Sequence, residues 1–406
     1  MIALRNLVDT LKQSFRLILD MLKNHIISLL IASTLSLVLV IKFIDWNKKP
    51  YKLDDFTFAA NYSNKDHIHT MQEYLNRGRI IIFGSSELNR DQRFVPQKFF
   101  NSELNIPLVT FGHGYHQTFS IMSQLAAFYN TEMEKNARIG ILISPLWFRS
   151  GGTVTQSFLE FMPEEMLRKL YFNDQIDDRY KLMIGKYIRE HKNEIVGSSS
   201  MITHASEYGQ SLFAISNWFR TQYNKLKFGD YYNGSYSVDL LNNADEESED
   251  IVTPDWVQLM SVGLKLEEAK MTSNSFGIED NYWEYLLDHT SGGTELMSMG
   301  DLPALEANKE YEQLIQLLDF CMLLDIKPLF IMQAQNPLIY HDIERYDNIL
   351  NNVELQIESR GFTYYNMHTS DRDKYIKGTL TDTAHMGEYG WVKMNKVVYE
   401  YFLEEK

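Results

Sequence analysis

Five short runs of mainly apolar residues constrain the fold of this chain more than any other feature. Four of them lack the alternation of polar and apolar residues, and most end at a glycine, serine or other turn-forming residue. Such runs indicate strands that are buried on both faces of a sheet. The predicted strands are residues 79–84, 107–112, 138–143, 328–332 and 362–365.

The segments between these runs have the periodicity of helices. We expect helices at residues 117–135, 308–325, 343–359 and 388–403. Alternating strands and helices imply a parallel sheet with helices on both faces. The predicted fold class is therefore α/β, a flavodoxin-like three-layer parallel sheet.

Residues 151–300 differ from the rest, since they are rich in aromatic and charged residues and poor in strand signals. Helices are expected here at 163–172, 177–193 and 205–227, followed by a loop with an acidic run at 245–250. The predicted organisation is one domain, residues 79–406, interrupted by a helical insertion at 151–300.

The N-terminal region contains an apolar segment without charge. Residues 26–41 carry no charged side chain, and the flanking residues extend the segment to the lower limit for crossing a bilayer. We predict an uncleaved transmembrane anchor at 25–45 and a polar tether at 46–78. A buried core helix and a cleaved signal peptide are the alternatives, but bulky residues follow the run where a signal peptide needs small ones.

Residues 1–24 form a predicted basic amphipathic helix ahead of the anchor. Its apolar positions fall on one face, and Arg5, Lys12, Arg16 and Lys23 gather beside that face. Such a helix suits an anionic membrane surface, or alternatively packs on the transmembrane segment of a partner. Four basic residues precede the span and four follow it closely, so charge does not decide its orientation.

Composition excludes some classes of protein. The net charge is −15, and the basic residues of the N-terminus leave the body more acidic still. An acidic body argues against nucleic-acid binding, which needs basic surface.

Cys321 is the single cysteine, which rules out an internal disulfide and a cysteine-rich zinc site. We expect it to be a buried structural thiol. We expect no metal and no cofactor.

Candidate functional residues follow the predicted strands, where ligands bind in open α/β sheets. Ser86 follows the first strand, where its hydroxyl can project into a cleft and its amide can face an oxyanion; a serine here can also be a simple helix N-cap. Gly112 and Gly114 follow the second strand, where glycine amides can serve as oxyanion donors or make a tight turn. Ser144 follows the third strand, directly before Pro145.

Asp382 and His385 precede the last predicted helix. At this spacing the carboxylate can bond imidazole Nδ1, set the tautomer and leave Nε2 free to accept a serine proton. We therefore predict Ser86, Asp382 and His385 as a catalytic triad, with Ser86, Gly112, Gly114 and Ser144 as oxyanion or substrate-binding residues.

This order of blocks resembles the SGNH, or GDSL-like, hydrolases. Gly84-Ser85-Ser86 is similar to the family's Gly-Asp-Ser block, which implies that Ser86 rather than Ser85 is the nucleophile. Asp382 and His385 match the last block. The third block departs from the family, because Ser144-Pro145 stands where Gly-x-Asn is usual.

A narrower resemblance covers nearly the whole chain. It is carried by FGSSEL at 83–88, SPLWF at 144–148, NSFGI at 274–278 and DTAHMGEYGW at 382–391. Together these segments resemble the DltD family of D-alanyl transfer proteins. The departures from the family are Leu146 in place of glutamine, Ser275 in place of proline, and the absence of a Pro-Val-Asn pattern at 333–337.

The resemblance implies a serine acyltransferase of the cell membrane, facing outward, that acts in D-alanylation of teichoic acid. It also implies a membrane-bound O-acyltransferase, an acyl carrier protein and a teichoic-acid-like polymer as partners. Two alternatives stay open: an SGNH esterase or thioesterase, and a non-catalytic scaffold for the membrane-bound acyltransferase system.

Overall fold

The computed structural model describes most of the body of the chain and part of its N-terminal region. The residues described are 23, 25–36, 38–39, 71–72, 74–149, 151–195, 200–207, 252–289 and 297–404. The chain divides into two compact units, Met1–Tyr51 and Lys52–Lys406, which are considered separately.

The body is built on a parallel sheet whose strand order is β2-β1-β3-β4-β5. Gly84 pairs with Gly112 and Ile143 with Met332, so the carboxyl ends of neighbouring strands lie at one edge of the sheet. The strands are β1 (Ile80–Gly84), β2 (Leu108–Gly112), β3 (Arg138–Ile143), β4 (Leu329–Met332) and β5 (Thr363–Asn366). The predicted parallel α/β sheet is thus confirmed.

Alternate residues of the strands enter two separate hydrophobic cores. In β1, Ile81 and Phe83 belong to the larger core, whereas Ile80 and Ile82 belong to the smaller one. Side chains of a strand point alternately to the two faces of a sheet. Both faces are covered by helices, which explains why the strand sequences are apolar without alternation.

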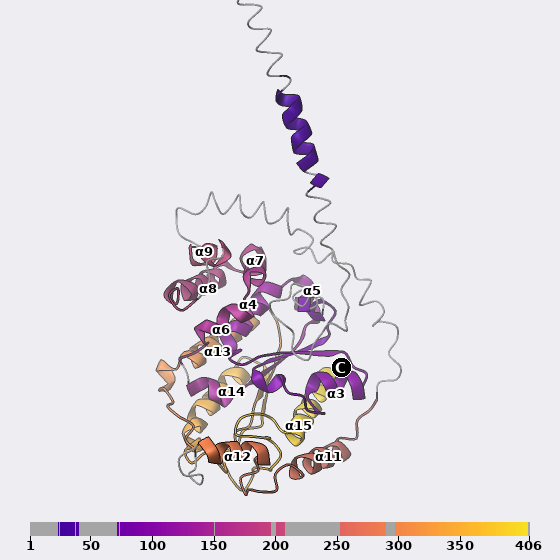
Figure 1. The fold of residues 1–406 in the computed structure, drawn as a ribbon, viewed down its shortest axis with the longest axis vertical. Helices are drawn as coiled ribbons and strands as arrows, with labels where there is room; N and C mark the ends of the chain where they lie inside the picture. The colour runs from indigo at the N-terminus through magenta and orange to yellow at the C-terminus, as the bar shows by residue number, and fades with distance from the viewer. Residues whose placement is uncertain are drawn as a thin grey trace, which may run out of the picture. The chain divides into compact units, whose positions relative to one another are not determined.

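The larger core lies under the helices on one side of the sheet (Figure 1). These include the four helices described between residues 155 and 207, which follow β3. The elements that contribute are α4 (Thr118–Phe128), α5 (Thr131–Asn136), α6 (Thr155–Phe161), α7 (Glu164–Phe172), α8 (Asp178–Glu190), α9 (Ser200–Glu207), α12 (Asp280–His289), α13 (Lys309–Leu323) and α14 (Asp347–Ser359).

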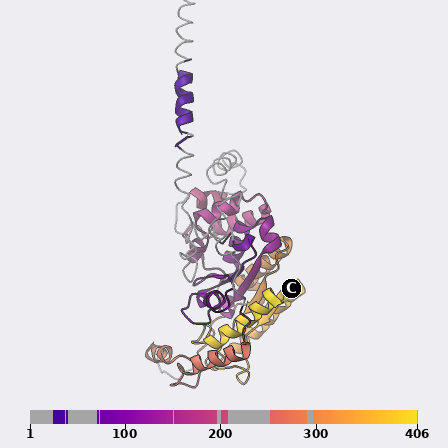
Figure 2. The ribbon, with the colours of Figure 1, turned by 90° about the vertical axis from the view of Figure 1, so that its right-hand side faces the viewer.

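The smaller core lies on the opposite side, under α3 (Pro96–Glu103), α11 (Trp256–Glu268) and α15 (Glu388–Tyr399). Figure 2 shows α11 alongside the C-terminal α15. The two helices approach closely at Gly263, because a Cβ built there would lie 3.1 Å from the backbone of Glu388. A segment of the predicted insertion therefore packs directly on the last helix.

Several predicted helices differ in detail from the structure. The predicted helix 117–135 is two helices, α4 and α5, because the Asn130 side chain accepts hydrogen bonds from Glu132 N and Met133 N and starts a new helix. The predicted helix 343–359 begins with a 3₁₀ turn, Ile343–Tyr346. The helices α3, α6, α11 and α12 were not predicted, and most of the predicted helix 205–227, as well as the acidic run 245–250, lies outside the described residues.

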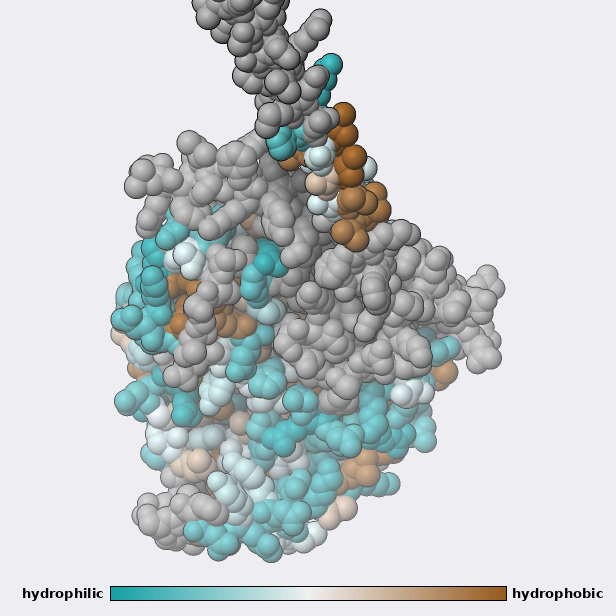
Figure 3. Space-filling view, turned by 45° about the horizontal axis from the view of Figure 1, so that its top comes forward, coloured by the Kyte–Doolittle hydropathy of each residue, from teal (hydrophilic) through white to brown (hydrophobic). Residues whose placement is uncertain are grey.

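The N-terminal unit is described only in its central part, where residues 25–36 and 38–39 are helical. Their large apolar side chains are exposed, and Figure 3 shows them as a hydrophobic column. Among the described residues, no helix has both the length and the apolar character needed to cross a membrane. The predicted anchor extends past these residues, and nearly all of the predicted amphipathic helix lies outside them.

The end of the predicted tether is part of the body. Residues 71–72 and 74–76 are helical, and Met71 and Leu75 are completely buried in the larger core. Here the structure differs from the expected irregular segment, because these apolar side chains have a core to pack against.

Candidate active site

Ser86 lies on a tight turn at the carboxyl end of β1. The strand ends at Gly84, and a 3₁₀ turn, η2, runs from Ser86 to Leu88. A Cβ built on Gly84 would lie 2.7 Å from Leu88 Cδ1, so the glycine leaves room for the Leu88 side chain to pack against the turn. The turn projects the Ser86 hydroxyl away from the strand and toward the C-terminal segment.

The structure brings Ser86, His385 and Asp382 together, although 299 residues separate the first two. Ser86 Oγ lies 3.1 Å from His385 Nε2, and His385 Nδ1 lies 2.8 Å from Asp382 Oδ2. These distances are within hydrogen-bonding range. We call these three residues the serine–histidine–aspartate cluster.

Asp382 is held by the backbone of its own loop. Its Oδ1 accepts hydrogen bonds from Ala384 N at 2.8 Å and from His385 N at 2.7 Å. Burial raises the pKa of the Asp382 carboxyl, but the hydrogen bonds and the charge of His385, together with the two backbone amides, lower it by more. The net direction is downward, so the carboxylate is ionised at neutral pH.

Arg90 is a neighbour of the cluster that was not predicted. Its Nη2 lies 2.7 Å from His385 Nδ1 and 3.4 Å from Asp382 Oδ2, while 41% of its side chain is exposed. Nothing in the sequence singles out this arginine, because it lies in a polar segment after Ser86 and belongs to no serine-hydrolase motif.

Helix α15 connects the loop of His385 to the loop that follows Ser86. The buried Glu388 carboxylate accepts a hydrogen bond from Phe94 N at 2.9 Å, and Trp391 Nε1 donates to Gln92 Oε1 at 2.7 Å. Glu388 N in turn donates to the carboxylate of Glu267 on α11. The side-chain amide of Gln333, after β4, donates to Ala384 O, and so supports the Asp382–His385 loop directly.

Gly112 has a packing role. A Cβ at Gly112 would lie 2.5 Å from Ser85 O and from Leu88 Cβ, so this glycine permits the close approach of the Ser86 turn. Around Gly114 no heavy atom lies within 4 Å of a built Cβ. The space next to Gly114 is therefore open, whereas that next to Gly112 is filled.

The neighbour of Gly114 has an unusual backbone. Tyr115 has φ +67°, a left-handed conformation that costs a bulky residue free energy, and the residue is 64% exposed. The turn is closed by a hydrogen bond from His116 N to His113 O. The strain is therefore confined to an exposed tyrosine in the loop that accompanies Ser86.

Ser85 and Ser144 have local partners. Ser85 Oγ donates to His113 O at 3.2 Å, and Ser85 N donates to Glu87 Oε1 at 2.7 Å. Ser144 is buried, and its Oγ accepts a 3.4 Å hydrogen bond from Leu146 N in the same turn. Neither hydroxyl is directed into the serine–histidine–aspartate cluster by these bonds.

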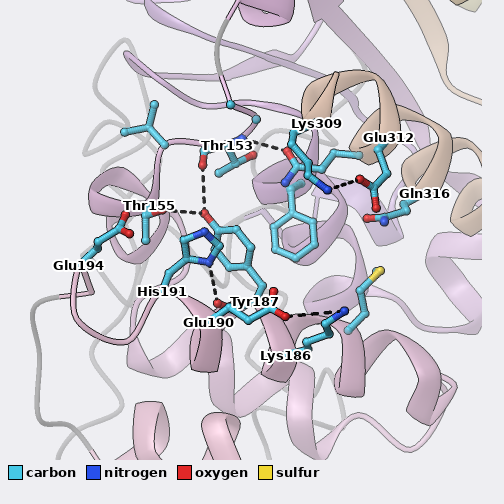
Figure 4. Close-up of a pocket in the computed structure, with 16 residues that line it drawn as sticks. Thr153, Thr155, Lys186, Tyr187, Glu190, His191, Glu194, Lys309, Glu312 and Gln316 are labelled. Carbon is cyan, nitrogen blue, oxygen red and sulfur yellow. Dashed lines mark hydrogen bonds and ion pairs between the residues drawn. The ribbon is translucent and has the colours of Figure 1, made fainter. Parts of the chain in front are cut away.

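A cavity of about 460 Å³ lies between α4, α8 and α13 (Figure 4). It is lined by Phe119, Tyr187, two lysines and three glutamates among others, and it shares no lining residue with the cluster. The two lysines are already paired, Lys186 with Glu190 and Lys309 with Glu312. The cavity is therefore separate from the serine–histidine–aspartate cluster and does not mark the place where the cluster acts.

Cys321 is completely buried, as predicted, and burial raises the pKa of its thiol. Within the described part of the chain, no group of three or more His, Cys, Asp or Glu side chains is arranged to hold a metal ion. The groups that meet at the cluster are the hydroxyl of Ser86, the imidazole of His385, the carboxylate of Asp382 and the guanidinium of Arg90.

Comparisons with known proteins agree on one family. The family model described as "DltD protein" matches residues 56–403. Protein DltD of Staphylococcus aureus is 22% identical over 335 residues, which cover 80% of this chain and 81% of that protein. Protein DltD of Bacillus subtilis is 24% identical over 332 residues, which cover 79% and 81% respectively. The family model spans far more than half of the chain, and the chain therefore belongs to the DltD family.

Proposed function

We propose that this protein is a membrane-anchored serine acyltransferase that takes part in D-alanylation of teichoic acid. The observation that carries the catalytic part is the relay of contacts from Ser86 Oγ to His385 Nε2 at 3.1 Å and from His385 Nδ1 to Asp382 Oδ2 at 2.8 Å. Membership of the DltD family supports the pathway.

The proposed reaction has two steps. Ser86 Oγ attacks the carbonyl carbon of an activated D-alanyl ester or thioester while His385 Nε2 takes the serine proton. The carbonyl re-forms, the leaving alcohol or thiol takes the proton from Nε2, and an acyl-serine remains. A hydroxyl of the polymer then attacks this ester, gives its proton to Nε2, and the proton passes to Ser86 Oγ as it leaves.

Two features support the assignment of roles within the site. The ionised Asp382 stabilises the imidazolium that forms in each step. The amides of Ser86 and Gly114 are the proposed oxyanion donors, because the surroundings of Gly114 are open while Gly112 packs against the Ser86 turn. Ser144 stays a predicted substrate-binding residue.

The location and partners are part of the proposal. The apolar N-terminal segment is the proposed single-pass anchor, and the body faces the outside of the cytoplasmic membrane. A membrane-bound O-acyltransferase, an acyl carrier protein and a teichoic-acid-like acceptor are the proposed partners, and nucleic acid is not among them.

Ser86→Ala tests the proposal, with Ser85→Ala as the matched control. Removal of the nucleophile should reduce transfer of a labelled D-alanyl group to the acceptor in membranes by about 10⁶-fold. Ser85→Ala loses only the bond to His113 O, so it should cost about 1 kcal/mol of stability and little transfer.

Single-turnover labelling separates the alternatives. Covalent acylation of Ser86 followed by transfer supports the acyltransferase, and release of the free acid alone supports an esterase or thioesterase. Full D-alanylation with Ser86→Ala would leave only the scaffold hypothesis. Loss with Ser85→Ala but not with Ser86→Ala would mean that Ser85 is the nucleophile.

A further inference from the structure

We propose that Arg90 is the anion-binding residue of the active site, and that a phosphodiester bound to it switches His385 into its reactive tautomer. The proposal rests on the proposed function in one respect, namely that the phosphodiester belongs to the acceptor polymer. It concerns a residue that the serine–histidine–aspartate scheme does not use.

The two hydrogen-bond contacts of His385 Nδ1 are incompatible in a neutral imidazole. Nδ1 lies 2.8 Å from Asp382 Oδ2 and 2.7 Å from Arg90 Nη2. A neutral imidazole nitrogen either carries a proton and donates, or carries a lone pair and accepts. Asp382 needs a proton on Nδ1, whereas the guanidinium, which has only donors, needs the lone pair. The two partners therefore compete for one nitrogen.

The outcome of this competition determines the reactivity of Ser86. When Nδ1 donates to Asp382, Nε2 has a free lone pair and accepts the Ser86 proton. When Nδ1 accepts from Arg90, the proton of the neutral ring is on Nε2, which can then only donate to Ser86 Oγ. Arg90 in its observed position thus favours the tautomer that cannot act as a base.

Arg90 is free to leave this position at small cost. Its side chain is 41% exposed, and its ion pair to Asp382 is long, at 3.4 Å. Arg93, only three residues further along, differs sharply, because its Nε and Nη2 form a bidentate pair with Glu103 at 2.8 and 3.1 Å. Among the described residues, Arg90 makes its hydrogen bonds through Nη2 alone, so its Nε and Nη1 donors suit an incoming oxyanion.

A phosphodiester is the chemistry that matches these donors. Guanidinium groups bind phosphate oxygens in bidentate fashion, and a strong anion outcompetes the lone pair of a neutral imidazole. With Arg90 on the phosphate, Nε2 releases its proton to solvent and Nδ1 takes one up, so the ring stays neutral. Nδ1 then donates to Asp382, and Ser86 becomes reactive. The site thereby discriminates phosphate-bearing substrates from water and neutral alcohols.

The positive charge of Arg90 also offsets the repulsion between this acidic protein and an anionic polymer. The chain has a net charge of −15, which opposes the approach of a polyanion. A partly exposed guanidinium in contact with the cluster provides local attraction at the reacting atoms. Two acidic groups interact with Arg90. The carboxyl of Glu87 interacts with its charge, and Asp382 forms an ion pair with it.

The test is the rate at which a neutral fluorophosphonate ester labels Ser86 in the purified full-length protein. In this reaction Ser86 Oγ bonds to phosphorus, the P–F bond breaks, fluoride leaves and the serine proton goes to Nε2. Dimethyl phosphate should accelerate labelling of the wild type by about 10-fold, which corresponds to a reactive tautomer that is about 10% populated without the anion. Potassium chloride at equal ionic strength should not accelerate it.

Variants give the matched comparison. Arg90→Gln should label as fast without dimethyl phosphate as the wild type does with it, and should not respond to it. Arg93→Gln, which removes the same charge from the same loop, should behave like the wild type. An equal response in Arg90→Gln, no response in the wild type, or a response to inorganic phosphate but not to the diester would overturn the proposal.

Nitrogen-15 NMR of histidine-labelled protein reads the tautomer independently of any activity. The His385 proton should move from Nε2 to Nδ1 when dimethyl phosphate is added, and should already be on Nδ1 in Arg90→Gln. An unchanged tautomer in both cases would refute the role of Arg90. Failure of Ser86 to react with the fluorophosphonate in every protein would instead refute the proposed function, while the NMR result would still decide the inference.

Discussion

At the scale of single residues, Asp382 does two things with its two oxygens. Oδ1 accepts the amides of Ala384 and His385 and fixes the loop, while Oδ2 faces His385 Nδ1. An amide in place of the carboxylate can keep one of these functions but not the negative charge. Its effect on catalysis should therefore be much larger than its effect on the fold.

Asp382→Asn should lower acyl transfer by about 10⁴-fold, because the asparagine amide cannot stabilise the reactive tautomer or the imidazolium. The measurement is transfer of labelled D-alanine, with urea unfolding as the check on stability. Glu103→Gln, which weakens the ion pair of Glu103 with Arg93, is the control and should keep normal transfer. Transfer by Asp382→Asn within 10-fold of wild type would contradict the proposed role.

Individual residues were predictable when residue type and position in the chain were both informative. Ser86, Asp382 and His385 each follow or precede a recognisable element, and their chemistry is specific. Arg90 could not be found in this way, because its contact with His385 depends on the path of a long side chain between segments 295 residues apart. No local pattern encodes that path.

At the scale of secondary structure, α15 is the element on which the site depends. The helix begins three residues after His385 and crosses the segment before Asp382 at very close range. Gly390 N donates to Gly378 O, and a Cβ at Gly390 would lie only 2.1 Å from Thr379 O. Any side chain here must push α15 away from the loop that carries Asp382.

Gly390→Ala should therefore destabilise the protein by about 3 kcal/mol, because the new methyl group overlaps a backbone oxygen that cannot move freely. Urea unfolding followed by circular dichroism measures this loss. Gly361→Ala is the comparison, since Gly361 has φ +78° but open space around it and should cost only about 1–2 kcal/mol for the strained backbone. Equal stability of the two variants would show that α15 does not pack as described.

The elements were predictable to the extent that they bury apolar side chains. The strands could be predicted because helices cover both faces of the sheet, which makes the strand sequences continuously apolar. Helix α11 was missed although Trp256, Leu259 and Met260 pack on the smaller core at helical spacing. Its buried residues are Gly263 and Glu267, and the 82% exposed Val257 blurs the apolar pattern. Its position is set by contacts with α15 and by the hydrogen bond to Glu388, which are tertiary features.

At the scale of the whole molecule, buried histidines connect stability to pH. His116 is completely buried between Gly84 O and Gln124 Oε1, and burial lowers the pKa of its imidazole to about 4. In the unfolded chain the pKa is near 6.5, so the unfolded state binds more protons between these values. Stability must then fall as the pH falls from about 6.5 to about 4.

His116→Gln should remove this contribution, which amounts to about 3 kcal/mol over the full interval. The variant should be less stable than the wild type at pH 7.5, because it loses well-packed contacts, and the gap should narrow toward pH 4.5. Urea unfolding at a series of pH values measures the difference. A gap that stays constant with pH would mean that His116 takes up its proton over the same pH range in the folded and the unfolded protein.

The division of the chain near residue 51 predicts that the body folds alone. A chain beginning at Lys52 should be soluble, since it lacks the apolar segment at 26–41, and should unfold in urea with the same midpoint as the full-length protein. Sedimentation with membranes and urea unfolding are the measurements. Continued membrane attachment of this shorter chain would reveal a second membrane-binding surface.

The hydrogen bonds between α15 and the loop after Ser86 determine when the site can form during synthesis of the chain. Ser86 is synthesised well before His385, which lies 299 residues later in the chain and is flanked by Asp382 and Glu388. Until α15 docks, the proposed nucleophile Ser86 lacks its proposed base His385, and the Glu388 carboxylate is not yet in place to accept the hydrogen bond from Phe94 N. Under the proposed function, a nascent chain in which α15 has not yet docked therefore cannot form the acyl-serine.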